Sequence, residues 1–158
     1  MRYFLIDKVT EFVPGKHARG LKAVTLSDQI LHDHFPDFPV MPAALIVEAA
    51  AQLGGFLLEM SVNRKGERPR RALLAQIQQA KFYETSGPGD VLDVLATIAS
   101  TLEEAAQVTA EVRVGDKRIA RAKLTFIMKD IDSERVHEQR RVLYRLWTRD
   151  FKEPLEIL

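Results

Sequence analysis

The segment from residue 43 to residue 58 is apolar or small around its whole circumference when it is drawn as a helix. A helix without a polar face has to be enclosed by its surroundings. The segment approaches the length of a membrane span, but the stretch up to residue 60 contains Glu48, Gln52 and Glu59 and is rich in alanine and glycine. We therefore expect a buried core helix that the rest of the chain encloses.

The remaining chain shows the alternation of apolar and polar residues that is typical of half-buried strands. Residues 108–114 and 120–128 alternate in this way and flank Gly115 and Asp116, which predicts a long antiparallel hairpin. Further strands are expected at residues 91–102, 73–83, 3–12 and 17–25. The fold class that follows is α+β, with a long antiparallel sheet wrapped around one buried helix.

A separate helix is expected at residues 133–149, beyond the last strand, with Ser133 as its N-cap. One side of this helix is formed by Val136, Leu143, Leu146 and Trp147. We divide the chain into a core domain at residues 1–130 and a helical extension at residues 131–158. The extension is expected to pack on the sheet or on a partner subunit.

Composition excludes several classes of function. The 158 residues fit one domain, and 46% hydrophobic with 28% charged residues is ordinary for a globular protein. A formal net charge of +1 creates no strong field, so we expect no nucleic-acid partner, and the core-helix interpretation leaves no membrane segment. Without cysteine there is no disulfide, thiolate nucleophile or thiolate metal site. The first residues have too short an apolar run for a signal peptide, so a cytoplasmic location is expected.

His34 stands in a loop that prolines restrain. Pro36, Pro39 and Pro42 each fix a φ angle, which leaves the imidazole little freedom. A histidine changes its charge near neutral pH and can act as a general base. A structural role in a stiff connection is the alternative, and the carboxyl group of Glu48 nearby in the sequence favours the chemical role.

Glu48 has only apolar neighbours in the expected core helix. Burial favours the protonated form of a carboxyl group, which suits a general acid, and a structural salt bridge is the alternative. Gln52 lies one turn further on the same face and could hydrogen-bond Glu48 or a ligand carbonyl.

The start of the expected helix supplies backbone N–H groups without helical partners and the positive end of the helix dipole. Such donors can stabilise an oxyanion or an enolate. Beside His34 and Glu48 they complete a set of base, acid and carbonyl polariser. The residues that we expect to bind substrate are Val40, Met41, Ala43, Ala44 and Gln52.

Two further groups of side chains have competing interpretations. His32 and His34 could bind a transition metal if a third ligand approached, but His17 and His137 lack ligand-like spacing, and no metal is expected. A basic cluster could receive an acidic partner or a phosphate, or could be a solvated loop. The cluster consists of Arg64, Lys65, Arg68, Arg70 and Arg71.

The run HFPDFPVMPAALIVEAAAQ, from His34 to Gln52, resembles the signature of the FabZ-type 3-hydroxyacyl-acyl-carrier-protein dehydratases. The similarity extends over about residues 3–128. The other segments that carry it are residues 4–9, 81–82, 88–90 and 115–117.

This resemblance implies the hotdog fold and a homodimer, which in that family is often assembled into trimers of dimers. It implies that His34 of one subunit meets Glu48 of its neighbour, with the acyl chain in a tunnel at the interface. The substrate would be a 3-hydroxyacyl thioester on the phosphopantetheine arm of acyl carrier protein or coenzyme A. His34 would remove the α-proton and Glu48 would protonate the departing hydroxyl, without a metal or redox cofactor. The pathway would be fatty-acid synthesis or related lipid or polyketide synthesis.

Three positions depart from the family pattern, because Asp33, Asp37 and Ala43 stand where family members usually have glycine. Alanine at position 43 keeps the N–H group but adds a methyl group where a thioester would approach. The residues after Asp130 also exceed the usual family core. An acyl-thioester hydrolase and a non-catalytic subunit that binds acyl carriers are the alternative functions.

Overall fold

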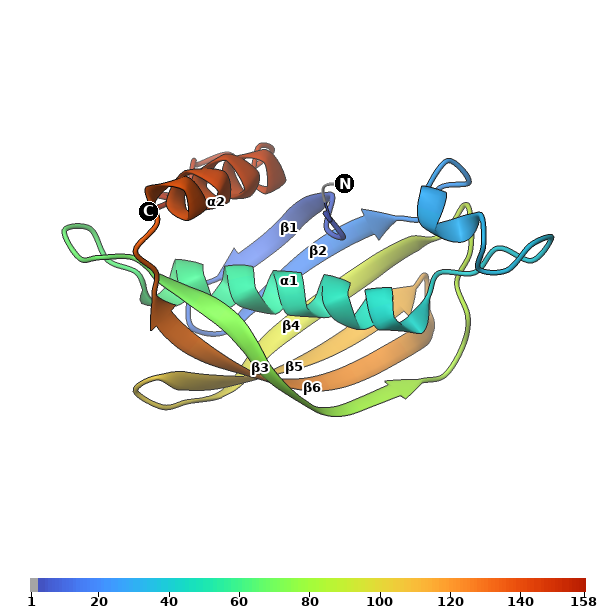
Figure 1. The fold of residues 1–158 in the computed structure, drawn as a ribbon, viewed down its shortest axis with the longest axis horizontal. Coiled ribbons are helices and arrows are strands. Elements are labelled where there is room, and N and C mark those ends of the chain that lie inside the picture. The colour runs from blue at the N-terminus through green and yellow to red at the C-terminus, as the bar shows by residue number, and fades with distance from the viewer. Residues whose placement is uncertain (1–2) are drawn as a thin grey trace.

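The computed structural model describes residues 3–158, and its central feature is one long helix that lies across a six-stranded sheet (Figure 1). This helix, α1 (Ala43–Val62), contacts every strand from β2 to β6. A short 3-10 helix, η1 (Gln29–Leu31), and the C-terminal helix α2 (Glu134–Trp147) complete the helical elements of residues 3–158. The strands are β1 (Lys8–Val13), β2 (His17–Ala23), β3 (Arg70–Phe82), β4 (Val91–Thr101), β5 (Ala105–Val114) and β6 (Lys117–Asp130).

The strands are ordered β1-β2-β4-β5-β6-β3, and all neighbours are antiparallel. The predicted hairpin is confirmed as β5 and β6, which turn at Gly115 and Asp116. Most of its apolar positions are buried, as the alternation predicted, including Val108, Leu124 and Phe126. The four other predicted strands are also present, although β1 begins later than expected. The α+β class and the hotdog arrangement of a sheet around a central helix are confirmed.

The helix and the sheet approach each other closely at two glycines. A Cβ atom on Gly54 would lie 3.2 Å from the ring of Phe126, and one on Gly20 of β2 would lie 3.1 Å from Leu53. These distances are shorter than ordinary van der Waals contacts, so only glycine permits the observed spacing without movement of a neighbour. α1 is long and apolar enough to span a membrane by composition, but it lies in the protein core as predicted.

α2 begins as predicted, because the Ser133 side chain accepts a hydrogen bond from the backbone N–H of Val136. Its buried side differs from the prediction, since Leu146 is 52% exposed. Leu143 and Trp147 are buried as predicted, and Tyr144 takes the place expected for Leu146. Tyr144 and Trp147 pack edge-on against Phe56 of α1, with ring centroids 5.0 and 6.1 Å away. The helix is therefore anchored by aromatic side chains rather than by leucines alone.

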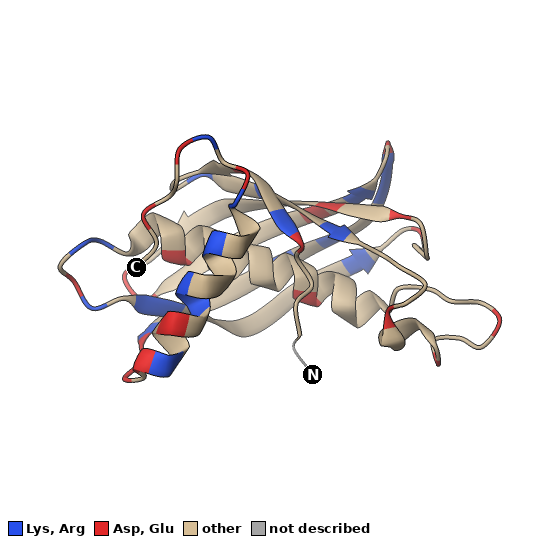
Figure 2. Cartoon of the chain, turned by 90° about the horizontal axis from the view of Figure 1, so that it is seen from above, with Lys and Arg blue, Asp and Glu red and all other residues tan. Residues whose placement is uncertain are grey.

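Charged residues are distributed unevenly between the elements (Figure 2). They gather on α2, on the connections and on parts of the sheet, whereas α1 is almost free of charge. The few acidic side chains of α1 therefore require an explanation in terms of partners or function.

Candidate active site

The loop that carries His34 is held by backbone hydrogen bonds as well as by its prolines. Val40 N–H donates to the carbonyl of His34 at 2.8 Å, and Met41 N–H donates to the carbonyl of Ser86 at 2.7 Å. Phe35 and Phe38 exchange two further hydrogen bonds of 2.9 and 3.0 Å. The loop is thus closed on itself and tied to the segment between β3 and β4.

The imidazole of His34 is half-buried and stacks on Phe35, with ring centroids 4.4 Å apart. Its ring nitrogens have no hydrogen-bond partner among residues 3–158, so they remain available to a ligand or to another subunit. Asp37 has φ +63°, in the left-handed region that favours glycine. This conformation explains physically why glycine suits position 37.

Glu48 is oriented by the side-chain amide of Gln52, whose nitrogen and oxygen both form hydrogen bonds. Its Oε1 accepts a hydrogen bond of 3.0 Å from Nε2 of Gln52, which also donates to the carbonyl of Tyr3 at 2.9 Å. Oε1 of Gln52 accepts from the N–H of Leu5 at 3.0 Å. The second carboxylate oxygen of Glu48 receives no hydrogen bond from within the described chain.

Glu48 is half-buried rather than enclosed, which differs from the expectation of full burial. It lies on the wall of an open cavity of about 270 Å³ between α1, β3, β6 and α2. The cavity is lined by Glu48, Ala51, Gln52, Gly55, Glu59, Ala72, Leu73, Leu74, Phe126, Arg140 and Tyr144. His34 does not line it. Within the described part of one chain, no hydrogen bond or ion pair joins His34 to Glu48.

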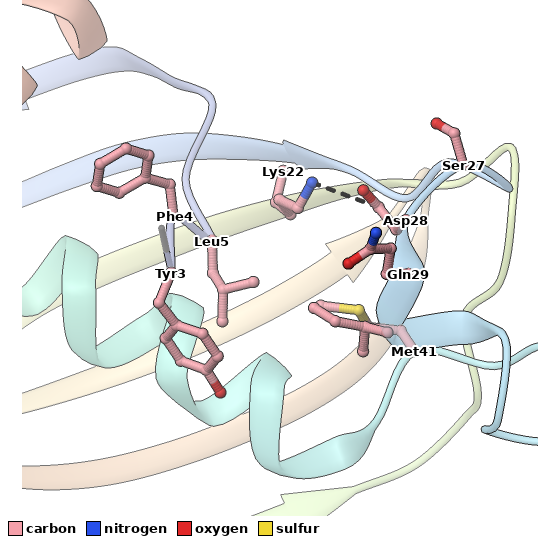
Figure 3. Close-up of a pocket in the computed structure, with 9 residues that line it drawn as sticks. Tyr3, Phe4, Leu5, Lys22, Ser27, Asp28, Gln29 and Met41 are labelled. Carbon is pink, nitrogen blue, oxygen red and sulfur yellow. Dashed lines mark ion pairs between the residues drawn. The ribbon is translucent and has the colours of Figure 1, made fainter. Parts of the chain in front are cut away.

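The start of α1 is open, as its role would require. Ala43 and Ala44 are exposed, and the N-cap residue Pro42 has no side chain that could accept their N–H groups. Val40 is half-buried and Met41 is buried. Met41 lines a second cavity of about 190 Å³ beside Tyr3, Phe4 and Leu5 (Figure 3).

The predicted basic cluster is largely occupied by contacts within the chain. Arg68 reaches Asp130 and Asp132 at 3.3 and 3.2 Å, and Lys65 lies 3.6 Å from Glu156. Arg64 and Arg70 donate to backbone carbonyls. The prediction is wrong for Arg71, which is 2% exposed and cannot reach a partner.

Arg71 belongs instead to a buried network that no local sequence pattern around it indicates. It donates to Oε2 of Glu59 at 3.0 Å and to Nδ1 of His137 at 3.0 Å. The hydroxyl of Tyr144 also donates to Oε2 of Glu59, at 2.9 Å. Burial, together with the Glu59 carboxylate, raises the pKa of Tyr144 well above its usual value, so its hydroxyl stays protonated.

One signal for this network was present in the sequence. Glu59 follows Glu48 on the same face of an apolar helix, where an acidic side chain needs a partner. The identity of that partner depends on the pairing of β3 with β6 and on the docking of α2. No group of three metal-ligating side chains of His, Cys, Asp or Glu occurs within residues 3–158.

The comparison with protein families matches residues 1–123 to a FabA-like domain. Two curated relatives are named 3-hydroxyacyl-acyl-carrier-protein dehydratase FabZ. The protein from Clostridium acetobutylicum is 36% identical over 124 residues, which cover 78% of this chain and 86% of the relative. The protein from Lactobacillus helveticus is 37% identical over 125 residues, which cover 79% of this chain and 82% of the relative.

Solved structures share the fold at low sequence identity. A chain of the dehydratase heterocomplex ApeI:P from Xenorhabdus doucetiae superposes with a TM-score of 0.68 at 15% identity, covering 87% of this chain and 90% of the other. A Streptococcus mutans protein bound to acetyl CoA superposes with a TM-score of 0.65 at 16% identity, covering 84% of this chain and 96% of the other.

Proposed function

The chain belongs to the FabA-like family, and from this membership we propose that it dehydrates 3-hydroxyacyl thioesters to trans-2-enoyl thioesters in fatty-acid or related lipid synthesis. The enzyme is a hydro-lyase. Its substrate is carried on a phosphopantetheine arm, and acyl carrier protein is the proposed partner. We place the reaction in the cytoplasm.

The observation that carries this proposal is the Glu48 carboxyl group, which the Gln52 amide holds at the wall of an open cavity. An oriented carboxyl group beside a space for a ligand is what a general acid requires. The free oxygen of Glu48 can carry the proton that the departing hydroxyl takes up.

The proposed reaction moves one proton and one hydroxyl group. His34 removes the proton α to the thioester carbonyl, and the electrons of that C–H bond move into an enolate. Collapse of the enolate forms the double bond and breaks the C–O bond at the β carbon, while Glu48 protonates the oxygen that leaves as water. The N–H groups of Ala43 and Ala44 stabilise the negative oxygen of the enolate. The thioester itself acidifies the α-proton, so the mechanism needs no metal or redox cofactor.

We further propose that each site is completed by two subunits, with His34 of one chain facing the partner subunit's Glu48. The separation of His34 from the Glu48 cavity within one chain supports this arrangement. The outer edge of β3 offers the surface for such a dimer, since Leu73, Ile77 and Phe82 are each more than 40% exposed.

The test is a turnover assay with 3-hydroxyacyl thioesters that records the absorbance of the conjugated enoyl product and the release of free thiol. We expect His34→Ala and Glu48→Gln each to lower kcat by about 10²- to 10⁴-fold, because each removes a proton-transfer group. His32→Ala is the matched control, since His32 is an exposed histidine of the same loop, and it should keep the wild-type rate.

Circular dichroism and thermal unfolding show whether each variant keeps its fold. Wild-type activity in folded His34→Ala or Glu48→Gln would refute the proposed roles. Release of thiol without enoyl formation would indicate a thioesterase instead.

A further inference from the structure

One face of α1 forms a continuous wall of the cavity that contains Glu48. Glu48, Gln52, Gly55 and Glu59 recur every three or four residues, so they lie on one side of the helix, and all of them line the cavity. Glu48 and Glu59 are eleven positions apart, which corresponds to about 16 Å along the helix axis. The cavity therefore extends from the proposed acid toward the C-terminal half of α1.

The middle of this cavity is apolar, which suits an alkyl chain. The side chains and glycine that line this part are Ala51, Gly55, Ala72, Leu73, Leu74 and Phe126. An acyl chain whose thioester end reacts at Glu48 would place its other end near Glu59.

That far end is polar and is built in part by α2, through Arg140 and Tyr144. The family model matches residues 1–123, so both side chains come from outside the matched region. α2 lies at the end of α1 opposite to the His34 loop (Figure 1). The C-terminal helix thus gives this chain a cavity end that the family match does not include.

At this end of the cavity, Glu59 and Tyr144 have hydrogen-bond partners among residues 3–158 but Arg140 does not. Oε2 of Glu59 accepts from Arg71 at 3.0 Å and from the Tyr144 hydroxyl at 2.9 Å, while Oε1 accepts from Ala72 N–H at 3.0 Å. Glu59 and Tyr144 therefore already have good partners. Arg140 makes no hydrogen bond with any residue of the described chain, and its Nε lies 3.9 Å from Oε1 of Glu59.

Arg140 lacks a hydrogen-bonded counter-charge in the described part of the chain. Arg71 lies 3.0 Å from Glu59 and also donates to a main-chain oxygen of Leu158, whereas Arg140 comes no nearer than 3.9 Å to Glu59. The Arg140 side chain is 38% exposed and therefore accessible. A guanidinium presents N–H donors in a planar fork that matches both oxygens of a carboxylate.

We propose that Arg140 binds the distal end of the acyl chain, and that the preferred substrates are 3-hydroxyacyl thioesters whose far end carries a carboxylate. This inference rests on the proposed function, because it requires the chain to lie along α1 from Glu48.

The test compares two series of 3-hydroxyacyl pantetheine thioesters with matched chain lengths, one ending in a methyl group and one in a carboxylate. The measured quantity is the ratio of kcat/KM for the two ends, in the wild type and in Arg140→Met, Arg140→Lys and Arg145→Met. Arg145 is exposed on the same helix and does not line the cavity, so Arg145→Met is the matched control.

We expect the wild type to prefer the carboxylate end, and only in chains long enough to reach from Glu48 to Arg140. Arg140→Met should lower the ratio about tenfold, mainly through a higher KM for the carboxylate series, because it removes a charge-assisted hydrogen bond at a partly exposed site. Arg140→Lys should retain part of the preference, and Arg145→Met should retain all of it.

A wild type that turns over both series without a preference at any length would overturn the role of Arg140, as would an unchanged ratio in Arg140→Met.

Turnover of neither series would contradict the dehydratase function instead. In that case, calorimetric titration measures the affinity for saturated acyl pantetheines that end in a methyl group or in a carboxylate. This tests the role of Arg140 in binding without requiring turnover. Equal affinities for the two ends in wild type and Arg140→Met would overturn it, and tighter carboxylate binding that depends on Arg140 would support it.

Discussion

At the scale of single residues, the side chain of Gln52 joins the candidate acid Glu48 to the N-terminal segment. Its amide donates to Glu48 and Tyr3 and accepts from Leu5, so the plane of the amide is fixed from both sides. A fixed donor next to a carboxylate restricts the directions in which that carboxylate can deliver a proton.

We expect Gln52→Leu to lower kcat by about 10- to 100-fold with a smaller change in KM, because a carboxyl group that turns away from the reacting atoms loses its alignment. The measurement is steady-state kinetics with one 3-hydroxyacyl thioester. Gln52→Glu, which keeps the acceptor but loses the donor to Glu48, should recover little activity. An unchanged kcat in Gln52→Leu would show that the amide only joins α1 to the N-terminal segment.

Asp37 provides a test of the loop conformation. Because its φ is +63°, we expect Asp37→Val to reduce the free energy of unfolding by about 1–2 kcal/mol, whereas Asp37→Gly should be tolerated. Urea unfolding followed by circular dichroism measures the difference. Asp33→Val is the matched control in the same loop, since Asp33 does not have a positive φ, and equal losses at both positions would contradict this explanation.

The sequence indicated candidate residues, whose catalytic roles stay predictions, but it did not indicate their surroundings. His34 and Glu48 were identified from residue type and position, but Glu48 was expected to be fully buried and is half-exposed. A helical pattern shows which residues share a face, but it does not show which face the sheet leaves uncovered. Arg71 was assigned to an exposed loop because its partners, Glu59 of α1 and His137 of α2, are distant in the sequence, but it is buried between them.

At the scale of elements, α2 is attached to the core by the Glu59 network as well as by aromatic packing. Glu59 of α1 binds Arg71 of β3 and Tyr144 of α2, so three elements meet at one carboxylate. Removing one partner of a buried ion pair leaves the other charge without compensation.

We expect Glu59→Gln to reduce the free energy of unfolding by about 3–5 kcal/mol, because the guanidinium of Arg71 stays buried without a counter-charge. Tyr144→Phe, which removes one hydrogen bond to the same carboxylate, should cost about 1–3 kcal/mol. Chemical denaturation measures both. Glu138→Gln is the control, since it breaks an exposed pair with Arg141 and should cost less than about 1 kcal/mol. A loss of similar size in Glu59→Gln and Glu138→Gln would contradict a stabilising role for the network.

Helices and strands could be predicted from the sequence where a local residue pattern was sufficient to define them. The alternation in β5 and β6 and the N-cap of α2 needed no tertiary information and are confirmed. The orientation of α2 was wrong for Leu146, because Phe56 of α1 selects Tyr144 and Trp147 as the packed residues. The division into a core at residues 1–130 and an extension at residues 131–158 stays a proposal.

At the scale of the whole molecule, the two edges of the sheet differ. The β1 edge is short and lies beside α2, where Lys8 pairs with Asp150 and Arg149 donates to the carbonyl of Asp7. The β3 edge is longer, and its residues from Leu73 onward are exposed. A long apolar edge strand is a natural site for association with a second chain.

We expect Ile77→Lys to convert the proposed dimer to a monomer and to abolish dehydration, because the charge falls on the exposed edge and the proposed site is shared by two subunits. Ile77 is 51% exposed in the isolated chain. Analytical ultracentrifugation gives the mass, and the enoyl assay gives the activity. Leu146→Lys, at a residue 52% exposed on α2, is the matched control and should leave both unchanged. A fully active Ile77→Lys monomer would refute a shared site.

The hydrogen bonds of Gln52 also determine how freely the N-terminal segment can vary during evolution. The hydrogen bonds of Gln52 to Tyr3 and Leu5 involve only main-chain atoms, so they do not depend on the identity of the exposed side chain at position 3. Position 5 has a stricter limit, because proline has no N–H group to donate. Among functional homologues that keep this glutamine, substitutions at position 3 should be frequent and proline at position 5 should be absent.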